Sequence, residues 1–355
     1  MVIQANQYKI ITDDTWSASL NRFLQQHPPS SCFILCDENT LQHCLPSLIT
    51  SCPLLAEAEI IEVEAGEQSK SLEIAAQIWH TLSEAQADRD MLLINLGGGV
   101  VTDLGGFCAS VYKRGVNFIN VPTSLLAMAD ASVGAKNGID FAGIKNMIGT
   151  FTEPVAVFVN PHFLRTLPQN QIMSGLAEVY KIALVSDRRF WSKLIKQNSQ
   201  DLPAHISASI VLKNKIVKKD PLDKGLRKIL NFGHTAGHAL ESASFLCNKP
   251  LLHGEAVLAG MLMESHLSWQ KKMIGKKTLD LITGAFMENF TLPDISLINE
   301  ADFFRLLQND KKNKNKQLLF SLLNDIGSCK TNVEVKEPLI KKAFDYYKRQ
   351  AHDQD

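Results

Sequence analysis

The 355-residue sequence lacks the features that would point to several broad classes of protein. It has 37 basic and 37 acidic residues, so its zero net charge gives no reason to expect a nucleic acid or an anionic membrane as a partner. No uninterrupted apolar run approaches the roughly 18 residues that a membrane span needs. The N-terminal stretch MVIQANQYKIITDDTW lacks the basic start and apolar run of a signal peptide. We therefore expect a cytoplasmic protein.

The cysteines do not form a recognisable disulfide framework. No two of them have the spacing Cys-x-x-Cys, and their number is odd. They are Cys32, Cys36, Cys44, Cys52, Cys108, Cys247 and Cys329. An odd and scattered set is typical of reduced thiols in a cytosol.

The first half of the chain alternates two kinds of pattern. Short apolar runs predict buried strands at 32–37, 91–99, 117–122 and 155–161. Between them, SLEIAAQIWHTLSEA has helical spacing and places on one face Leu72, Ala75, Ala76, Trp79 and Leu82. This alternation predicts a parallel sheet with helices on its faces.

The second half changes character near Leu167 and Pro168. From about residue 171 the patterns are helical, as in QIMSGLAEVYKIALV and EAVLAGMLMESHLSWQ, and no convincing strand occurs before the tail. We therefore expect an α/β domain over residues 1–167 and a helical domain over residues 168–355.

A run of three glycines follows the strand in INLGGGVVTDLGGF. Glycines before a helix N-terminus let a phosphate approach backbone N–H groups. The spacing is not the dinucleotide fingerprint G-x-G-x-x-G, and the best acidic candidate, Asp37, precedes the turn instead of following it. A merely tight connection remains the alternative.

Fixed charges gather in the glycine-rich stretch DASVGAKNGIDFAGIKNMIG. It carries Asp130, Lys136, Lys145 and Asn146 among apolar residues. Such a loop suits a phosphate or carboxylate. A solvated surface loop is the alternative, but the interleaved apolar residues favour a site lining.

Histidines cluster in LRKILNFGHTAGHALE and LHGEAV. His234 and His238 are four residues apart and share a helical face. With His253 and a carboxylate such as Glu178, they could form a zinc site with one open position. A metallopeptidase helix would read H-E-x-x-H, but Thr235 stands where its glutamate would be. The spacing alone does not say whether His238 is a ligand.

Together these segments resemble the 3-dehydroquinate synthase family. The resemblance runs from GEQSK at 66–70 to DKKNK at 310–314. It rests on an ordered set of motifs: LGGGVVTDLGGF, YKRG, VPTSLLAMADASVGAK, GIKNMIGTF, TLP, GLAEVYK, LRKILNFGHTAGHALE and LHGEAV. The ordered set is far more specific than any single motif.

The resemblance implies a fold and an activity. The fold is an α/β N-terminal Rossmann-like domain that binds NAD and an all-α C-terminal domain that carries a metal ion. The substrate is 3-deoxy-D-arabino-heptulosonate 7-phosphate, and the products are 3-dehydroquinate and phosphate. The steps are transient oxidation by NAD, phosphate elimination, reduction, ring opening and aldol closure, so NAD is regenerated.

The resemblance also implies site residues. The zinc ligands would be Glu178, His234 and His253, and cobalt would fit a similar set. His238 would move protons beside the substrate without binding the metal. The other substrate-pocket residues would be Asp130, Lys136, Lys145, Asn146, Lys181, Lys213, Arg227, Asn231 and Lys311. All of these except Lys145 and Lys311 would also take part in catalysis.

Arg114 in YKRG would reach the substrate phosphate of a neighbouring subunit, which implies a homodimer. Besides Lys136 and Lys145, the residues that meet NAD would be Asp37, Glu67, Lys70, Gly98, Gly99, Asp103, Thr123, Ser124, Phe163, Thr166 and Leu167.

Three positions depart from the family pattern. These are Ser124, where threonine is common, Ala135, where glycine is common, and Gln171, where many members have glutamate.

Two other interpretations compete. One is another sugar-phosphate cyclase, or an NAD-linked polyol dehydrogenase, of the same architecture. Arg227 with Asn231 and Lys213 disfavours it, because only a substrate with a carboxylate needs a cation there. The other is a non-catalytic NAD-binding or regulatory protein, which would have little reason to keep the histidines and so many lysines.

Overall fold

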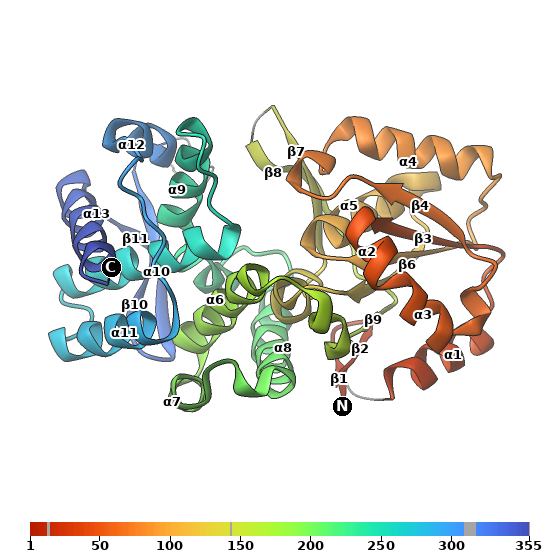
Figure 1. The fold of residues 1–355 in the computed structure, drawn as a ribbon, viewed down its shortest axis with the longest axis horizontal. Coiled ribbons are helices and arrows are strands. Elements are labelled where there is room, and N and C mark those ends of the chain that lie inside the picture. Colours follow the sequence, from red (N-terminus) through yellow and green to blue (C-terminus); the bar gives the residue numbers. More distant parts are fainter. Residues whose placement is uncertain (13–14, 143, 309–316, 355) are drawn as a thin grey trace. The chain divides into compact units, whose positions relative to one another are not determined.

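The computed structural model describes residues 1–12, 15–142, 144–308 and 317–354 (Figure 1). The chain forms two compact units, Met1–Pro168 and Gln169–Asp355. We call them unit 1 and unit 2. Among the described residues, none of the helices combines the length and apolar character that crossing a bilayer requires.

Unit 1 is built on a seven-stranded sheet with the order β1-β2-β9-β6-β5-β3-β4. The strands are β1 (Val2–Gln4), β2 (Lys9–Ile11), β3 (Cys32–Asp37), β4 (Glu59–Val63), β5 (Leu92–Gly97), β6 (Asn117–Pro122) and β9 (Ala156–Phe158). All neighbouring pairs are parallel except β1 and β2. The predicted parallel sheet is thus confirmed, with one short antiparallel strand added at its edge.

Helices cover this sheet. They are α1 (Trp16–Gln26), α2 (Glu38–His43), α3 (Leu45–Ser51), α4 (Leu72–Glu84) and α5 (Gly99–Val111). The helix α5 packs on β3, β5 and β6, and α4 packs on α5 and β4. The buried face of α4 is Ala75, Ile78 and Leu82, whereas Leu72 and Ala76 are exposed. The face predicted for this helix was therefore partly wrong, because its contacts with α5 and β4 select a stripe displaced around the helix.

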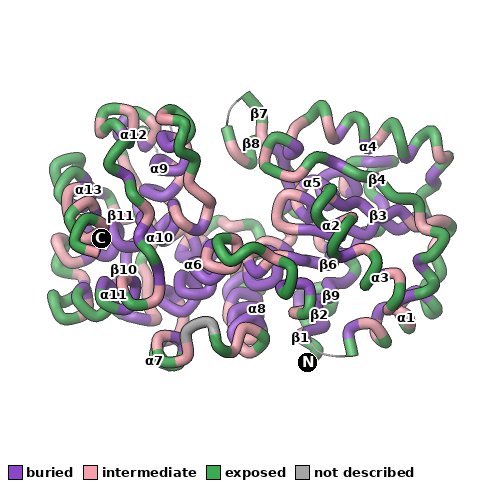
Figure 2. Tube along the Cα trace, viewed as in Figure 1, coloured by how far each residue is buried: buried purple, intermediate pink, exposed green. Residues whose placement is uncertain are grey.

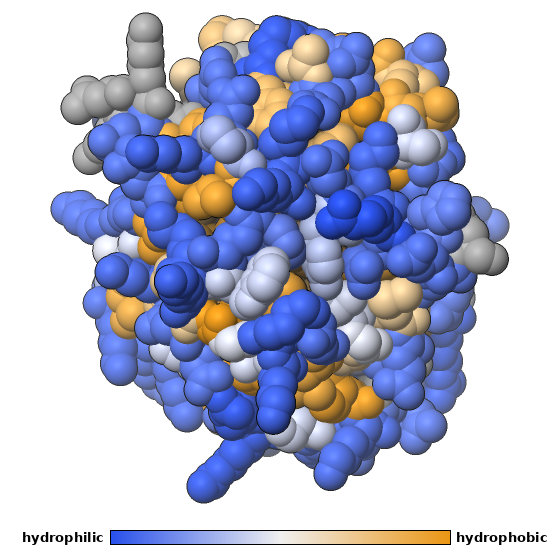
Figure 3. Space-filling view, turned by 90° about the vertical axis from the view of Figure 1, so that its left-hand side faces the viewer, coloured by the Kyte–Doolittle hydropathy of each residue, from blue (hydrophilic) through white to orange (hydrophobic). Residues whose placement is uncertain are grey.

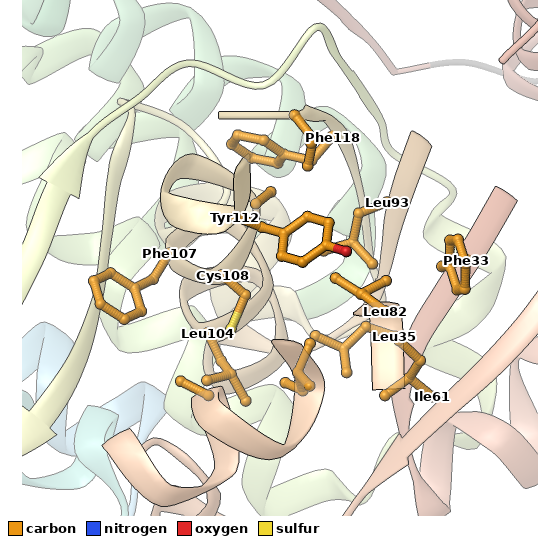
Figure 4. Close-up of a cluster of buried hydrophobic side chains, with 14 of the residues drawn as sticks. Phe33, Leu35, Ile61, Leu82, Leu93, Leu104, Phe107, Cys108, Tyr112 and Phe118 are labelled. Carbon is orange, nitrogen blue, oxygen red and sulfur yellow. The ribbon is translucent and has the colours of Figure 1, made fainter. Parts of the chain in front are cut away.

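A hydrophobic core joins these layers (Figure 4). Phe33, Leu93 and Phe118 project from three neighbouring strands, and Leu82 and Leu104 come from α4 and α5. Each of these five side chains is almost completely buried. Burial of apolar area on this scale stabilises the sheet against its helices and holds the carboxyl ends of β3, β5 and β6 in place.

An antiparallel hairpin of β7 (Lys136–Phe141) and β8 (Ile144–Phe151) is attached to α5. The attachment depends on Gly106, where an added Cβ would lie 2.1 Å from Oδ1 of Asn137. This close approach holds the hairpin against α5.

Unit 2 is mainly helical. Its helices are α6 (Gln169–Ser186), α7 (Arg188–Gln197), α8 (Leu202–Lys219), α9 (His234–Leu246), α10 (His253–Gln270), α11 (Lys276–Asn289), α12 (Glu300–Gln308) and α13 (Glu337–His352). An antiparallel pair of β10 (Leu319–Asp325) and β11 (Ser328–Glu334) lies in the tail. The predicted helical domain is confirmed, with this hairpin as an addition to the all-α expectation.

The helix α10 is the centre of unit 2. It contacts α6, α9, α11, α13 and β10, and it is buried almost from end to end (Figure 2). Its central run at 256–263 has no polar face to turn toward solvent, which is typical of a helix inside a protein. The outer face seen from the side of α11 and α13 is largely hydrophilic, with hydrophobic residues in small groups (Figure 3).

Candidate metal centre and cofactor-binding region

Three potential metal ligands converge in unit 2. Glu178 lies on α6, whereas His234 and His253 are the first residues of α9 and α10. One ligand atom from each lies within 4.8 Å of the others. The Nε2 atoms of His234 and His253 lie 3.4 and 3.3 Å from Oε1 of Glu178. We call this group the metal trio.

Close helix contacts bring the metal trio together. A Cβ on Gly254 would lie 2.0 Å from the carbonyl oxygen of Ser174, so α10 and α6 almost touch backbone to backbone. A Cβ on Gly260 would lie 1.9 Å from the carbonyl oxygen of Gly233, at the start of α9. The two glycines allow one helix to approach both of the others.

The donor set fits a divalent metal ion. Glu178 is 1% exposed, and neither of its carboxylate oxygens has a hydrogen-bond partner among the described residues, although Oε2 forms an ion pair with Lys181. A buried carboxylate without hydrogen bonds is costly. Two donors each about 2.0–2.1 Å from a tetrahedral zinc ion lie about 3.3 Å apart, which matches the separations of the imidazole nitrogens from Glu178.

The surroundings of His253 are strongly negative. Burial lowers the pKa of His253, but the nearby carboxylates of Glu178 and Glu241 outweigh it and raise the pKa to about 10. The same field attracts a metal cation.

His238 is brought next to the metal trio. Its ring centroid lies 5.2 Å from that of His234 and 5.9 Å from that of His253. With Glu241 and His253 it forms a second group whose ligand atoms lie within 4.8 Å of one another. This proximity is compatible both with a ligand and with a proton-transfer group, so the role of His238 stays a prediction.

Buried cations come from three elements that contact one another, namely α6, α8 and the 3-10 turn η7 (Leu226–Asn231). Lys181, Lys213 and Arg227 are 2%, 6% and 4% exposed. Asn231 ends η7 and is half-buried. Buried cations at this density favour an anionic ligand.

The loop before η7 orients Arg227. Oδ2 of Asp220 accepts hydrogen bonds from the backbone N–H groups of Gly225 at 2.7 Å and Arg227 at 3.0 Å. Backbone donors, that of Arg227 foremost, lower the pKa of Asp220. Nη1 of Arg227 donates to the carbonyl oxygen of Pro221 at 3.0 Å.

In unit 1, the glycine turn connects β5 to α5. Gly98 precedes the helix and offers no side-chain cap. A Cβ on Gly98 would lie 3.4 Å from Oγ of Ser124, and the N–H of Thr123 donates to the carbonyl oxygen of Gly97 at 3.0 Å. Residues after β6 therefore flank the turn at the carboxyl edge of the sheet, where ligands bind in open α/β sheets.

Asp37 ends β3 at the same edge, and its Oδ1 accepts the N–H of Thr40 at the start of α2. Phe163 and Thr166 lie in the 3-10 turn η5 (Pro161–Thr166) that follows β9, and Leu167 comes directly after it. The ring of Phe163 is buried and packs against Trp16, with centroids 6.1 Å apart.

A charged network lies beside α5. Lys70 is 4% exposed, and its Nζ lies 2.7 Å from Oδ2 of Asp103 and 3.9 Å from Oε1 of Glu67. Glu67 lies 3.9 Å from Nζ of Lys145. Burial lowers the pKa of Lys70, but the acidic neighbours, above all Asp103, outweigh it and raise the pKa.

Two of the three predicted site residues on the hairpin are exposed, and the third, Lys145, is half-buried. Lys136 and Asn146 are exposed, whereas Asp130, in a single π-helical turn at Ala127–Ala131, is half-buried. Asn146 has φ +50°, and its N–H donates to Oδ1 of Asp140 at 2.7 Å. The N–H of Asp140 in turn donates to the carbonyl oxygen of Lys70 at 2.7 Å. Sequence reasoning missed Asp140, which links the hairpin to the charged network.

The remaining predicted positions are dispersed. Arg114 is exposed, with φ +70°, at the end of a 3-10 turn (Tyr112–Arg114). Ala135 has φ +62°, in the left-handed region that favours glycine, so its departure from the family pattern falls where a glycine would be less strained. Lys311 lies outside the described residues.

Comparisons with known proteins cover both units. The family model for the 3-dehydroquinate synthase N-terminal domain matches residues 60–174, and the one for the C-terminal domain matches residues 175–313. A 3-dehydroquinate synthase from Parabacteroides distasonis is 37% identical over 348 residues, which cover 97% of this chain and 98% of that protein. Another from Enterococcus faecalis is 42% identical over 282 residues, 77% of each chain.

A solved structure of 2-deoxy-scyllo-inosose synthase, complexed with carbaglucose-6-phosphate, NAD+ and Co2+, has the same fold. Its TM-score is 0.86 at 21% identity, over 96% of this chain and 98% of that one. At this identity the likeness concerns the fold alone.

Proposed function

The chain belongs to the 3-dehydroquinate synthase family, so it is an enzyme that forms 3-dehydroquinate, and we propose that the metal trio holds the divalent metal ion of this reaction. The observation that carries the proposal is the convergence of three ligand groups within 4.8 Å around the buried carboxylate of Glu178. Zinc is the expected metal, and cobalt suits the same donors.

The metal ion, when bound, supplies a Lewis acid that polarises a substrate hydroxyl group. Glu178, His234 and His253 would hold the ion with three donors, the number typical of a catalytic zinc site. His238 stands beside them, and imidazole groups exchange protons near neutral pH. We assign to His238 the movement of a proton at the substrate and not the binding of the metal ion.

The cations of unit 2 bind the anionic groups of the substrate, 3-deoxy-D-arabino-heptulosonate 7-phosphate. Arg227 and Lys213, with Asn231, receive the carboxylate, because a buried guanidinium forms charge-assisted hydrogen bonds with it. Lys181 forms an ion pair with Glu178 and would therefore lie close to a substrate bound at the metal trio.

Unit 1 binds NAD. The N–H groups of Gly98 and Gly99 at the start of α5 suit the pyrophosphate, and Asp37 lies at the next strand end. Contacts with the cofactor are assigned also to Glu67, Lys70, Asp103, Thr123, Ser124, Lys136, Lys145, Phe163, Thr166 and Leu167. Asp130 and Asn146 are assigned to the substrate together with the two lysines of the hairpin. NAD, when bound, would supply a hydride acceptor that is regenerated in the reaction, so it would not be consumed.

The assembly and location are also proposals. The exposed Arg114 would act on the substrate phosphate of a neighbouring subunit, which requires a homodimer. A cytoplasmic location is supported by seven cysteines that are all free thiols.

The experiment is an assay of the purified protein with the heptulosonate phosphate, zinc and substoichiometric NAD. We expect phosphate and 3-dehydroquinate to form in equal amounts, well beyond the amount of NAD. Accumulation of NADH in proportion to product would instead identify a dehydrogenase. Assays with other heptulose phosphates test the alternative of a different cyclase, which the relatives at 37% and 42% identity do not favour.

A further inference from the structure

We propose that two buried glutamates outside the metal trio, Glu241 and Glu264, are positioning residues that hold its two histidines. The inference rests on the proposed metal site and goes beyond its ligands. Glu241 is 3% exposed and Glu264 is 0% exposed. Unpaired carboxylates are almost never found at such depth, so the partners of each one indicate what it does.

Glu241 faces the ring of His253. Its Oε2 lies 3.4 Å from Nδ1 of His253, whereas Nε2 of the same ring lies 3.3 Å from Oε1 of Glu178. If Nε2 binds the metal ion, Nδ1 carries the proton and donates it in a hydrogen bond to Glu241. A carboxylate in this position fixes both the tautomer and the plane of a ligating imidazole.

Glu264 acts on His234 through the backbone. Its Oε2 accepts the N–H of Gly233 at 2.7 Å, and its Oε1 accepts the N–H of Ala236 at 3.1 Å. Gly233 precedes α9, has φ +81° and has no side chain with which to cap the helix. A buried carboxylate therefore satisfies two donors at this helix N-terminus, where the helix dipole favours a negative charge.

The contacts of Glu264 fix the position of the backbone at His234, the first residue of α9. The carbonyl oxygen of Gly233 lies against Gly260, one helical turn before Glu264 on α10. The backbone on both sides of His234 is thus held by α10, through the close contact and one hydrogen bond at Gly233 and through a second hydrogen bond at Ala236.

The helices α9 and α10 each position the histidine of the other. The helix α9 begins with His234 and carries Glu241 about two turns later, and α10 begins with His253 and carries Glu264 about three turns later. Each helix therefore supplies one histidine of the metal trio and the glutamate that positions the histidine of the other helix. A shift of α9 along α10 would disturb both histidines together.

A second arrangement must be distinguished from this one. His238, Glu241 and His253 are themselves close enough to hold a metal ion. In that case Glu241 would be a ligand and His253 would bind through Nδ1. His234→Ala would then retain the metal ion, whereas Glu241→Gln would lose it.

The test measures zinc affinity on the full-length, metal-depleted protein by competition with a chromophoric chelator. Glu241→Gln should weaken zinc binding by about 10- to 100-fold, the usual effect of removing such a partner. Glu264→Gln loses the charge and one acceptor, and should weaken zinc binding by about tenfold. Activity is not needed for either measurement.

Two controls separate positioning from general stability. Glu288→Gln removes the same charge from an exposed position on α11, and Ile282→Val trims a buried side chain of that helix. We expect Glu288→Gln to change neither melting temperature nor zinc affinity. Ile282→Val should lower the melting temperature and leave zinc affinity unchanged.

A measurement on the unaltered protein tests the role of Glu241 even if Glu241→Gln does not fold. Nitrogen-15 NMR of the histidine rings in the zinc-loaded protein should find His253 bound through Nε2 with a proton on Nδ1. Binding through Nδ1 would overturn the role of Glu241, as would an unchanged affinity in folded Glu241→Gln. Unchanged affinity in folded Glu264→Gln would overturn the role of Glu264. A wild-type protein that binds no zinc would remove the proposed metal site itself, which is a different failure.

Discussion

His234 and His238 lie one turn apart on α9, with ring centroids 5.2 Å apart, yet we expect them to have different functions. His234→Ala should lose both zinc and activity, because it removes one of the three proposed ligands. His238→Ala should keep its zinc and lose most of its rate, because only proton transfer is removed. Metal analysis of the two purified variants measures the difference. A folded but metal-free His238→Ala protein would make His238 a ligand.

Arg227 allows a second prediction at the scale of a residue. Arg227→Leu should reduce kcat/KM for the heptulosonate phosphate. The reduction should correspond to a loss of about 1.5–3 kcal/mol in transition-state stabilisation, the usual scale for a hydrogen bond to a charged group. Lys224→Leu, which changes an exposed cation in the preceding loop, serves as the control and should have little effect. Unchanged kinetics in Arg227→Leu would place the guanidinium outside the substrate site.

At the scale of elements, the approach of α10 to α6 depends on one glycine. Gly254→Ala should destabilise the protein by about 1–3 kcal/mol, as overpacking does, and should weaken zinc binding, because the new Cβ would collide with the backbone of Ser174 beside His253. Denaturant unfolding and zinc titration measure the two effects.

Gly284 provides the matched control for that substitution. It is an exposed glycine of α11, and a Cβ there would meet nothing within 4 Å. Gly284→Ala should therefore stabilise the protein by about 0.5–1 kcal/mol through helix propensity alone and leave zinc binding unchanged. A Gly254→Ala protein as stable as Gly284→Ala would show that α10 can shift without cost.

At the scale of the whole molecule, Arg114 tests the shared site. Arg114→Ala subunits and His234→Ala subunits should each be inactive alone. Mixed dimers should regain activity, because one of their two sites combines an intact metal trio with an intact Arg114 from the other subunit. Activity is measured after subunit exchange, which mass-tagged subunits report independently. Exchanged dimers without activity would rule out a contribution across the interface.

The order of motifs along the chain was enough to predict the family, the parallel sheet and the helical second half. These properties depend on local patterns, namely apolar periodicity, glycines at strand ends and histidines at helical spacing. Glu241 was also within reach of the sequence, because it lies seven residues after His234 and so on the same helical face. Its contact with His253, from another helix, was not.

Other features were decided only by tertiary structure. Glu264 directly follows an apolar run at 256–263 on α10, and the N–H groups that donate to it are 31 and 28 residues earlier in the chain. Nothing local marks it, because its partners are created by the packing of α9 against α10. The same holds for the contact between Asp140 and Lys70, in which the N–H of Asp140 donates to a carbonyl oxygen 70 residues earlier in the chain. The sequence by itself determined which chemical groups the protein has and which elements carry them. Close packing at Gly254 and Gly260 decided which of these groups meet, because such contacts require the backbones of distant segments to approach each other.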